Sequence, residues 1–189
     1  MEIKKKNMRR FLKYVLILIC LFSFTNNSSA GGNVCGVHET PNAVFDYSQK
    51  LLRDKDINQY YHCINKEDRY KTVESTLVAL LMASSFFDDI NNALLPILKK
   101  HGYTTGGDVE VELKRIKNIK QLYVDLFSVL SLIYEKNGQV PGDINNKLSD
   151  IVIKGKFASG TIIYSGNNAK TEKAYFKQNN GGWYLSLAE

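Results

Sequence analysis

The hydrophobic pattern of this 189-residue chain changes its period near residue 140, and this change limits the folds that the chain can adopt. Before that point apolar residues recur every three or four positions, which is the spacing of amphipathic helices. After it, short segments rich in β-branched and aromatic residues are separated by Gly and Asn, which is typical of an antiparallel meander. We therefore predict a single α+β domain over 31–189, with helices over 41–137 packed on a meander of three to four strands over 150–188.

The helical part begins with a clear N-terminal signal. Thr40 can accept a hydrogen bond from a free amide, and Pro41 lacks a donor that the first helical residue would leave unused. The helix that starts here is predicted to end near Arg53, and a second short helix is predicted over 57–65.

Two long helices are predicted in the centre of the chain, over 67–100 and 113–137. Gly102 follows a pair of lysines at the end of the first helix, which is a typical stop signal. We expect the two helices to be antiparallel and joined near Gly106 and Gly107.

Three residues set finer expectations in this central region. Pro96 removes a hydrogen bond from a continuous helix, so we expect a kink or a break over 93–95. His101, near a helix C-terminus, is interpreted as a cap rather than as a metal ligand. Asp108 is a candidate cap for the next element, although the alternation of residues 109–112 leaves a strand as the alternative.

The last predicted strand contains the only tryptophan of the chain, Trp183. Trp183 and Leu185 share one face of this strand, and Tyr184 lies on the other. We expect Trp183 to be a core anchor, buried between the sheet and the helices. Turns are predicted at 166–169 and 179–182, where a pair of glycines supplies the positive φ of the second turn.

The first 30 residues have the pattern of a secretory signal peptide. Residues 1–13 carry six basic side chains and one acidic one, and 14–24 is an apolar run of eleven residues. A membrane-spanning helix needs about 20 apolar residues, whereas a run of about 7 to 15 after a basic start is typical of a signal peptide. We expect cleavage after Ala30, a periplasmic or secreted mature protein, and no stable membrane span.

Two alternatives remain for this segment. An uncleaved membrane anchor is disfavoured by the shortness of the apolar run. Lipidation at Cys20 is disfavoured because Ile19 precedes it, where lipoprotein processing requires a small side chain.

Removing the predicted signal peptide changes the charge of the chain. The whole chain has 25 basic and 19 acidic side chains, and the mature chain retains 19 and 18 of them. A surface that binds nucleic acid needs Lys and Arg clustered in the folded domain. We therefore interpret the basic excess as part of the export signal and expect no nucleic-acid partner.

Two cysteines, Cys35 and Cys63, remain in the mature chain. An even number of cysteines in an exported protein predicts a disulfide, and only one pairing is available. A metal or thiol pair is the alternative, but the chain has no C-x-x-C motif. We expect this disulfide to pin the N-terminal segment onto the first two helices.

The early helices and the closing meander together resemble a known superfamily. The likeness covers 41–65 and 150–187, and the last two strands carry its pattern at Tyr175, Phe176, Lys177, Gly182, Trp183 and Leu185. The chain resembles the nuclear-transport-factor-like and ketosteroid-isomerase-like cone-fold proteins, in particular small exported bacterial members of unknown function. The resemblance implies a curved sheet that wraps a helix and encloses a pocket.

The resemblance does not extend to the centre or to a catalytic set. Residues 67–137 are more helical than this superfamily usually is, which implies either an insertion in the cone fold or a different fold. The isomerase branch uses an Asp base with a Tyr and a protonated acid, and no residue-by-residue match to that set is present.

The residues give no sign of a catalytic, metal or cofactor site. The histidines, His38, His62 and His101, are far apart and follow no metal-binding spacing. Phosphate-binding, dinucleotide-binding and hydrolase motifs are also absent from the sequence.

Tyrosine is abundant, with 11 residues, and supplies the candidate contact residues. A tyrosine offers apolar area together with a hydrogen bond, so it suits a pocket or a partner surface. The candidates are Tyr60, Tyr61, Tyr164, Tyr175 and Tyr184.

We therefore predict an exported non-catalytic binding module that engages a protein partner in the cell envelope, such as an immunity, inhibitor or accessory protein. The first alternative is a cone-fold pocket protein that binds or acts on an apolar small molecule. A secreted effector that acts on host components is the second. The oligomeric state is not predicted.

Overall fold

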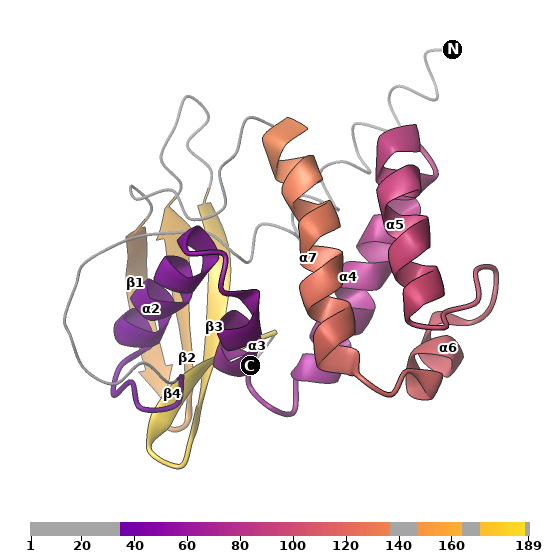
Figure 1. The fold of residues 1–189 in the computed structure, drawn as a ribbon. Helices are drawn as coiled ribbons and strands as arrows, with labels where there is room; N and C mark the ends of the chain where they lie inside the picture. The colour runs from indigo at the N-terminus through magenta and orange to yellow at the C-terminus, as the bar shows by residue number, and fades with distance from the viewer. Residues whose placement is uncertain (1–34, 137–146, 164–170, 188–189) are drawn as a thin grey trace.

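The chain folds as an α+β protein. A computed structural model describes residues 35–136, 147–163 and 171–187 (Figure 1). Over these residues six helices precede a four-stranded antiparallel sheet, which confirms the predicted fold class. One helix, α2, lies across a face of the sheet, and the longer helices stand beside it as a bundle. The predicted signal peptide lies outside the described residues.

The first two helices begin at side-chain caps. In α2 (Pro41–Arg53), the hydroxyl of Thr40 accepts a hydrogen bond from the amide of Ala43 at 3.1 Å. In α3 (Ile57–Cys63), the carboxylate of Asp56 accepts one from the amide of Gln59 at 3.0 Å. Each cap satisfies a donor that a helix N-terminus leaves free, so both predicted starts are explained by local chemistry.

The single predicted helix over 67–100 is two helices, α4 (Arg69–Ser84) and α5 (Asp88–Lys100). The predicted break over 93–95 is wrong, because the chain breaks between these two helices and Pro96 lies inside α5. The kink, which was the other form of this expectation, stays a prediction. Pro96 and Asn92 are both exposed, so the carbonyl of Asn92 that loses its helical donor lies on the solvent side of α5.

Serine hydroxyls and a pair of aspartates explain where the break occurs instead. The hydroxyls of Ser84 and Ser85 both bond to the carbonyl of Leu81, at 2.7 and 3.2 Å, and so compete with the helical backbone bonds. Asp88 and Asp89 then occupy the first turn of α5, where negative charge favours a helix start.

The second predicted long helix is also divided, into α6 (Val109–Arg115) and α7 (Ile119–Lys136). Asp108 caps α6 by accepting a bond from the amide of Val111 at 3.0 Å, which confirms the predicted cap and excludes the alternative strand over 109–112. The amide of Gln121 donates to the side chain of Asn118 at 3.0 Å, which marks a new helix start.

Helices α3 to α7 bury one continuous apolar core. Its fully buried members include Leu77, Leu80, Ile90, Leu94, Leu98, Leu113, Leu122, Tyr123 and Leu126. Among the described helices none combines the length and the apolar character needed to cross a bilayer.

The strands form a simple meander in the order β1-β2-β3-β4. They are β1 (Lys147–Lys154), β2 (Phe157–Ile163), β3 (Thr171–Asn179) and β4 (Gly182–Ser186). The pairing of β1 with β2 shifts register between Ser149 and Val152. Asp150 lies at this bulge with a φ of 51°.

The turn between β3 and β4 has positive φ at both central residues, Asn180 at 50° and Gly181 at 82°. This is the geometry that a two-residue hairpin prefers. The predicted turn is therefore confirmed, but the pair of glycines does not supply it, because Gly182 is the first residue of β4. The predicted turn at 166–169 lies outside the described residues.

Trp183 is buried as predicted, with only 3% of its surface exposed. It lies in a second apolar cluster with Val44 and Phe45 of α2 and with Ile162 and Phe176 of the sheet. Burying an indole excludes roughly 200 Å² from water, so Trp183 anchors α2 to the sheet.

Two backbone segments cover the outer edge of β4. The carbonyl of His38 accepts a hydrogen bond from the amide of Trp183 at 2.9 Å. Further along β4, the carbonyl of Leu185 accepts one from the amide of Asn65 at 2.8 Å. An open strand edge invites pairing with other chains, and these two bonds occupy part of this one.

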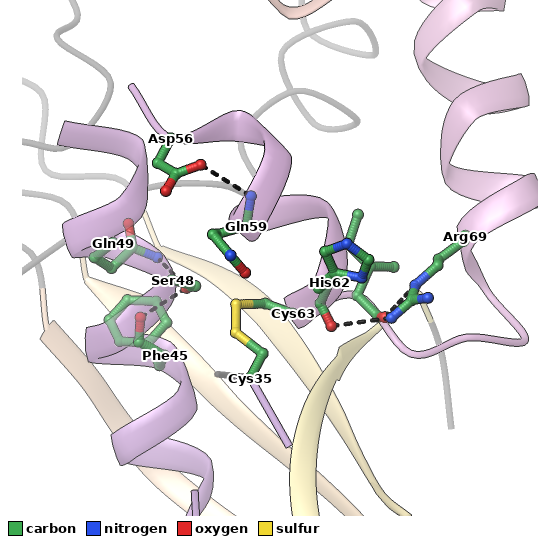
Figure 2. The surroundings of a disulfide bond; sticks show 10 residues. Cys35, Phe45, Ser48, Gln49, Asp56, Gln59, His62, Cys63 and Arg69 are labelled. Carbon is green, nitrogen blue, oxygen red and sulfur yellow. Dashed lines mark hydrogen bonds between the residues drawn. A yellow bond between two sulfur atoms is a disulfide. The ribbon is translucent and has the colours of Figure 1, made fainter. Parts of the chain in front are cut away.

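The disulfide between Cys35 and Cys63 joins the two covering segments (Figure 2). Arg69 of α4 supports the second segment by donating to the carbonyls of Ile64 and His62, at 3.0 and 3.1 Å. The crosslink and Arg69 therefore hold both covering segments in place.

Two glycines permit the close approach of the N-terminal segment to β4. A Cβ on Gly182 would lie 1.8 Å from the carbonyl oxygen of Gly36, and a Cβ on Gly36 would lie 2.1 Å from the hydroxyl of Tyr184. Real Cβ atoms do not approach other atoms so closely, so a side chain at Gly182 displaces the backbone of this segment. A side chain at Gly36 displaces the ring of Tyr184 and is strained by the φ of 104° at that position.

We expect the double substitution Cys35→Ser and Cys63→Ser to lower the free energy of unfolding by about 3 to 4 kcal/mol, because the crosslink restricts the unfolded chain. Urea unfolding followed by Trp183 fluorescence measures this change. Amide exchange at Trp183 and Asn65 should accelerate more than exchange in α7. Equal acceleration at all sites would contradict the assigned role of the disulfide at the β4 edge.

We expect Gly182→Ala to destabilise the protein by about 2 kcal/mol or more, because the new methyl group collides with backbone that the disulfide holds in place. Gly107→Ala is the matched control, since a Cβ there meets only the side chain of Glu112, at 3.3 Å. Thermal unfolding compares the two variants, and an equal loss in both would refute the close-approach argument.

Candidate interaction surface

The structure divides the predicted tyrosines between the core and the sheet surface. Tyr60 and Tyr61 are 0% and 8% exposed and belong to the core of the helical bundle. Tyr175 and Tyr184 are half-buried on the face of the sheet opposite α2. Tyr164 lies outside the described residues. The five tyrosines therefore do not form one pocket or one surface.

Tyr61 has the surroundings of a packing residue. Its ring lies 5.4 Å from that of Tyr123, and the guanidinium of Arg69 lies 5.4 Å from the centre of the Tyr61 ring. Burial raises the pKa of Tyr61, and the charge of Arg69 opposes that rise. These contacts link α3, α4 and α7, so Tyr61 is part of the packing between these helices.

The two half-buried tyrosines lie at the covered end of their sheet face. Tyr175 borders a hollow with Thr72 of α4, and the hydroxyl of Tyr184 fills the space beside Gly36. Nearby, the hydroxyl of Ser186 donates to the carboxylate of Asp68 at 2.7 Å. The start of α4 and the N-terminal segment thus pack on this face at β3 and β4.

The rest of this face is exposed or half-buried, and we call it the open sheet face. It consists of Val152, Lys154, Phe157, Ser159, Thr161, Ile163 and Lys173. Val152, Phe157 and Ile163 are exposed apolar residues, at 51%, 37% and 41%. None of the three is a tyrosine, so they were not predicted as contact residues. Alternation along β2 nevertheless places Phe157 and Ile163 on the face opposite Ile162.

Lysines surround the apolar part of the open sheet face. The ammonium of Lys177 lies 5.6 Å from the centre of the Phe157 ring and pairs with Glu67. The ammonium of Lys173 donates to the hydroxyl of Thr161 at 3.3 Å. Between residues 147 and 187 the chain has six lysines and two acidic residues, so this part of the protein is basic.

The hollow beside Tyr175 is small, with a volume of about 20 Å³. Its lining is mostly apolar and comes from α2, the start of α4 and strands β2 to β4. A space of this size holds about one water molecule. Small-molecule sites usually need about 300 Å³ or more, so this hollow is too small for one.

The three histidines do not gather. His38 packs against the ring of Tyr47 at 4.8 Å, and burial lowers the pKa of His38. His62 lies 3.3 Å from the ammonium of Lys120. Burial and the nearby charges of Lys120 and Arg69 lower the pKa of His62. Within the described ranges no three His, Cys, Asp or Glu side chains are arranged to hold a metal ion.

Asp125 on α7 is the centre of the best-connected polar cluster. Its carboxylate accepts hydrogen bonds from Lys100 at 2.5 Å and Gln121 at 3.0 Å and bonds to the ring of His101 at 2.8 Å. Burial alone would raise the pKa of Asp125, but these bonds hold it at about 2. The cluster ties the end of α5 to α7, so His101 has a structural role that goes beyond capping.

The pKa of Asp46 on α2 is shifted in the opposite direction. Burial raises the pKa of Asp46 to about 6, and the charge of Arg53 opposes this rise. Perturbed acids are common at active sites, but desolvation of a half-buried helix residue accounts for this one without a reaction partner.

Comparison with protein-family models, with curated proteins and with solved structures found no match to this chain.

We expect Asp125→Asn to lower the free energy of unfolding at pH 7 by about 1 to 2 kcal/mol, because the folded protein stabilises the ionised carboxylate. A pKa held below its ordinary value stabilises the fold above about pH 4, and this contribution is lost as the pH falls through about 2. The difference between variant and parent, measured by denaturant unfolding, should therefore shrink as the pH falls from about 5 and approach zero only below about pH 2.

The control for this experiment is Asp54→Asn, which removes a carboxylate from an exposed helical pair with Lys50. Its effect should stay within about 0.5 kcal/mol. A difference for Asp125→Asn that is independent of pH would contradict the electrostatic explanation.

Proposed function

We propose that this protein is an exported, non-catalytic binding module that engages a protein partner in the cell envelope through its open sheet face. The observation that carries the proposal is the exposure of Val152, Phe157 and Ile163 on one face, among lysines. Val152 and Phe157 are diagonal neighbours across β1 and β2, whereas Ile163 lies at the other end of β2. Exposed apolar residues beside charged ones are common at protein interfaces.

Export is supported by two features of the chain. The first 30 residues have a basic start and a short apolar run, which is typical of a signal peptide. The Cys35–Cys63 disulfide is of the kind that persists in oxidising compartments.

The charge of the sheet favours a partner with carboxylates at the contact surface. Lys154 and Lys173 belong to the open sheet face, and Lys147 lies at its edge. Complementary charge mainly raises the association rate and excludes wrong partners. An immunity, inhibitor or accessory protein is consistent with such a surface.

The size of the hollow supports a protein partner over an apolar small molecule, because about 20 Å³ holds roughly one water molecule. The relation to the cone-fold superfamily remains part of this proposal. In that interpretation α4 to α7 are an insertion between the helix and the sheet.

Site-specific photocrosslinking tests this proposal. A photoreactive phenylalanine analogue at position 157 should give a defined protein adduct in envelope fractions, because that side chain lies inside the proposed interface. The same analogue at position 78, an exposed site on α4, is the matched control. Equal labelling from both positions, or no adduct from position 157, would refute the proposal.

With the partner identified, Phe157→Asp should weaken binding roughly 30-fold, the effect of losing about 2 kcal/mol at an interface centre. Val78→Asp should leave the affinity unchanged. Trp183 fluorescence verifies that both variants are folded.

A further inference from the structure

β1 is the outer strand of the sheet, and its far edge has no partner among the described strands. The strand exposes apolar side chains on both faces near this edge. Val152, which pairs with Ser159, is 51% exposed on the open sheet face, and Ile153 is 56% exposed on the opposite face. An edge with exposed apolar residues on both faces is suited to pairing with another extended segment.

The hydrogen-bond pattern shows which backbone groups face that edge. The amide of Gln178 donates to the carbonyl of Lys156 at 2.7 Å, so the polar groups of Phe157 are directed toward β1 rather than β3. Phe157 pairs with Lys154, so Lys154 directs its own N–H and C=O toward β2. Successive residues of a strand direct these groups to alternate sides. The N–H and C=O of Ile153 are therefore directed away from β2, toward the open edge.

The lysines at both ends of β1 indicate whether a second copy of this chain or a different chain pairs with this edge. A second copy paired antiparallel along the whole strand would place Lys147 opposite Lys154 at both ends. Like charges directly opposite one another destabilise a pair of strands. A segment with acidic residues in those positions gains the opposite interaction, so charge favours a different chain.

We propose that β1 accepts an extended segment of the protein partner as a fifth strand, with apolar residues in the middle of the segment and acidic residues at its ends. The proposal builds on the binding function above and names how the partner is held. Backbone bonds at Ile153 give affinity, whereas Val152, Lys147 and Lys154 select the sequence.

The bulge at Asp150 sets the length of the paired region. Regular pairing with β2 runs from Val152 to Lys154, and the register shift separates this part from Ser149. A segment that spans the whole strand would form its most regular backbone bonds along the second half of β1 and would meet Lys147 beyond the bulge. Short pairing of this kind suits a reversible contact.

Two synthetic peptides test the inference on the mature chain. Both alternate valine and threonine over five residues, and they end in two glutamates or in two lysines on each side. We expect the glutamate peptide to bind at least about tenfold more tightly, with the largest amide shifts at Ile153 and its neighbours in β1. Equal affinities, or no binding of either peptide, would overturn the proposal.

Substitutions separate backbone pairing from side-chain contact. Ile153→Pro removes the outward N–H at a position where an edge strand tolerates proline, and it should abolish binding. Ile153→Thr keeps that N–H and should bind within a few-fold of the parent. The double substitution Lys147→Glu and Lys154→Glu should reverse the preference between the two peptides. Retained binding by Ile153→Pro, with Trp183 fluorescence unchanged, would refute strand addition.

Two further outcomes distinguish this inference from the binding function on which it builds. If Ile153→Pro leaves the photocrosslink from position 157 unchanged, the partner binds the face and not the edge, and strand addition is wrong. If the parent chain gives no adduct, the binding function itself fails, whatever the peptides do. A dimer of the parent in sedimentation that Ile153→Pro dissociates would assign the edge to a second copy and overturn the proposal.

Discussion

The fold depends on the way in which the edge of β4 is covered. The carbonyl of His38 and the amide of Asn65 bond to the backbone of β4, and the Cys35–Cys63 disulfide ties the segments that carry them. A four-stranded meander has two edges, and each is open to pairing with other chains. Here one edge is partly covered by segments that the crosslink joins, and one of these segments leads into α2, so the cover of the edge and the position of the helix are linked.

The other edge of the sheet, at β1, is protected against association in another way. β1 ends in lysines and contains a bulge at Asp150, both of which are common devices against edge-to-edge association. Val152 and Ile153 have the opposite effect, because exposed apolar side chains on an edge strand favour association. This combination resists a second copy of the chain and leaves the strand accessible to a segment of complementary charge.

Much of the fold could be predicted because its signals are local. Helix starts at Thr40 and Asp108 depend on one side chain and one amide, and the burial of Trp183 follows from strand alternation. The break before α5 could not be predicted in the same way. It arises because serine hydroxyls compete with backbone donors for a carbonyl. In the sequence, two serines are a weaker signal for a helix break than Pro96 is.

The surface was less predictable than the fold, since exposure depends on what other elements cover. Tyr60 and Tyr61 carry the same chemistry as Tyr175, yet helices α4 and α7 surround the first two. In the sequence Phe157 and Val152 look like ordinary strand residues. They are exposed because α2 covers the opposite face of the sheet.

The covered edge also has a consequence for the order in which the chain assembles. The two segments that flank β4 carry His38 and Asn65, and both precede β4 in the chain. The Cys35–Cys63 crosslink joins these segments without any residue of the sheet, so they can be held together before β4 docks between them. Until β4 docks, β3 is the outer strand of the sheet, so this docking step completes both the sheet and its cover.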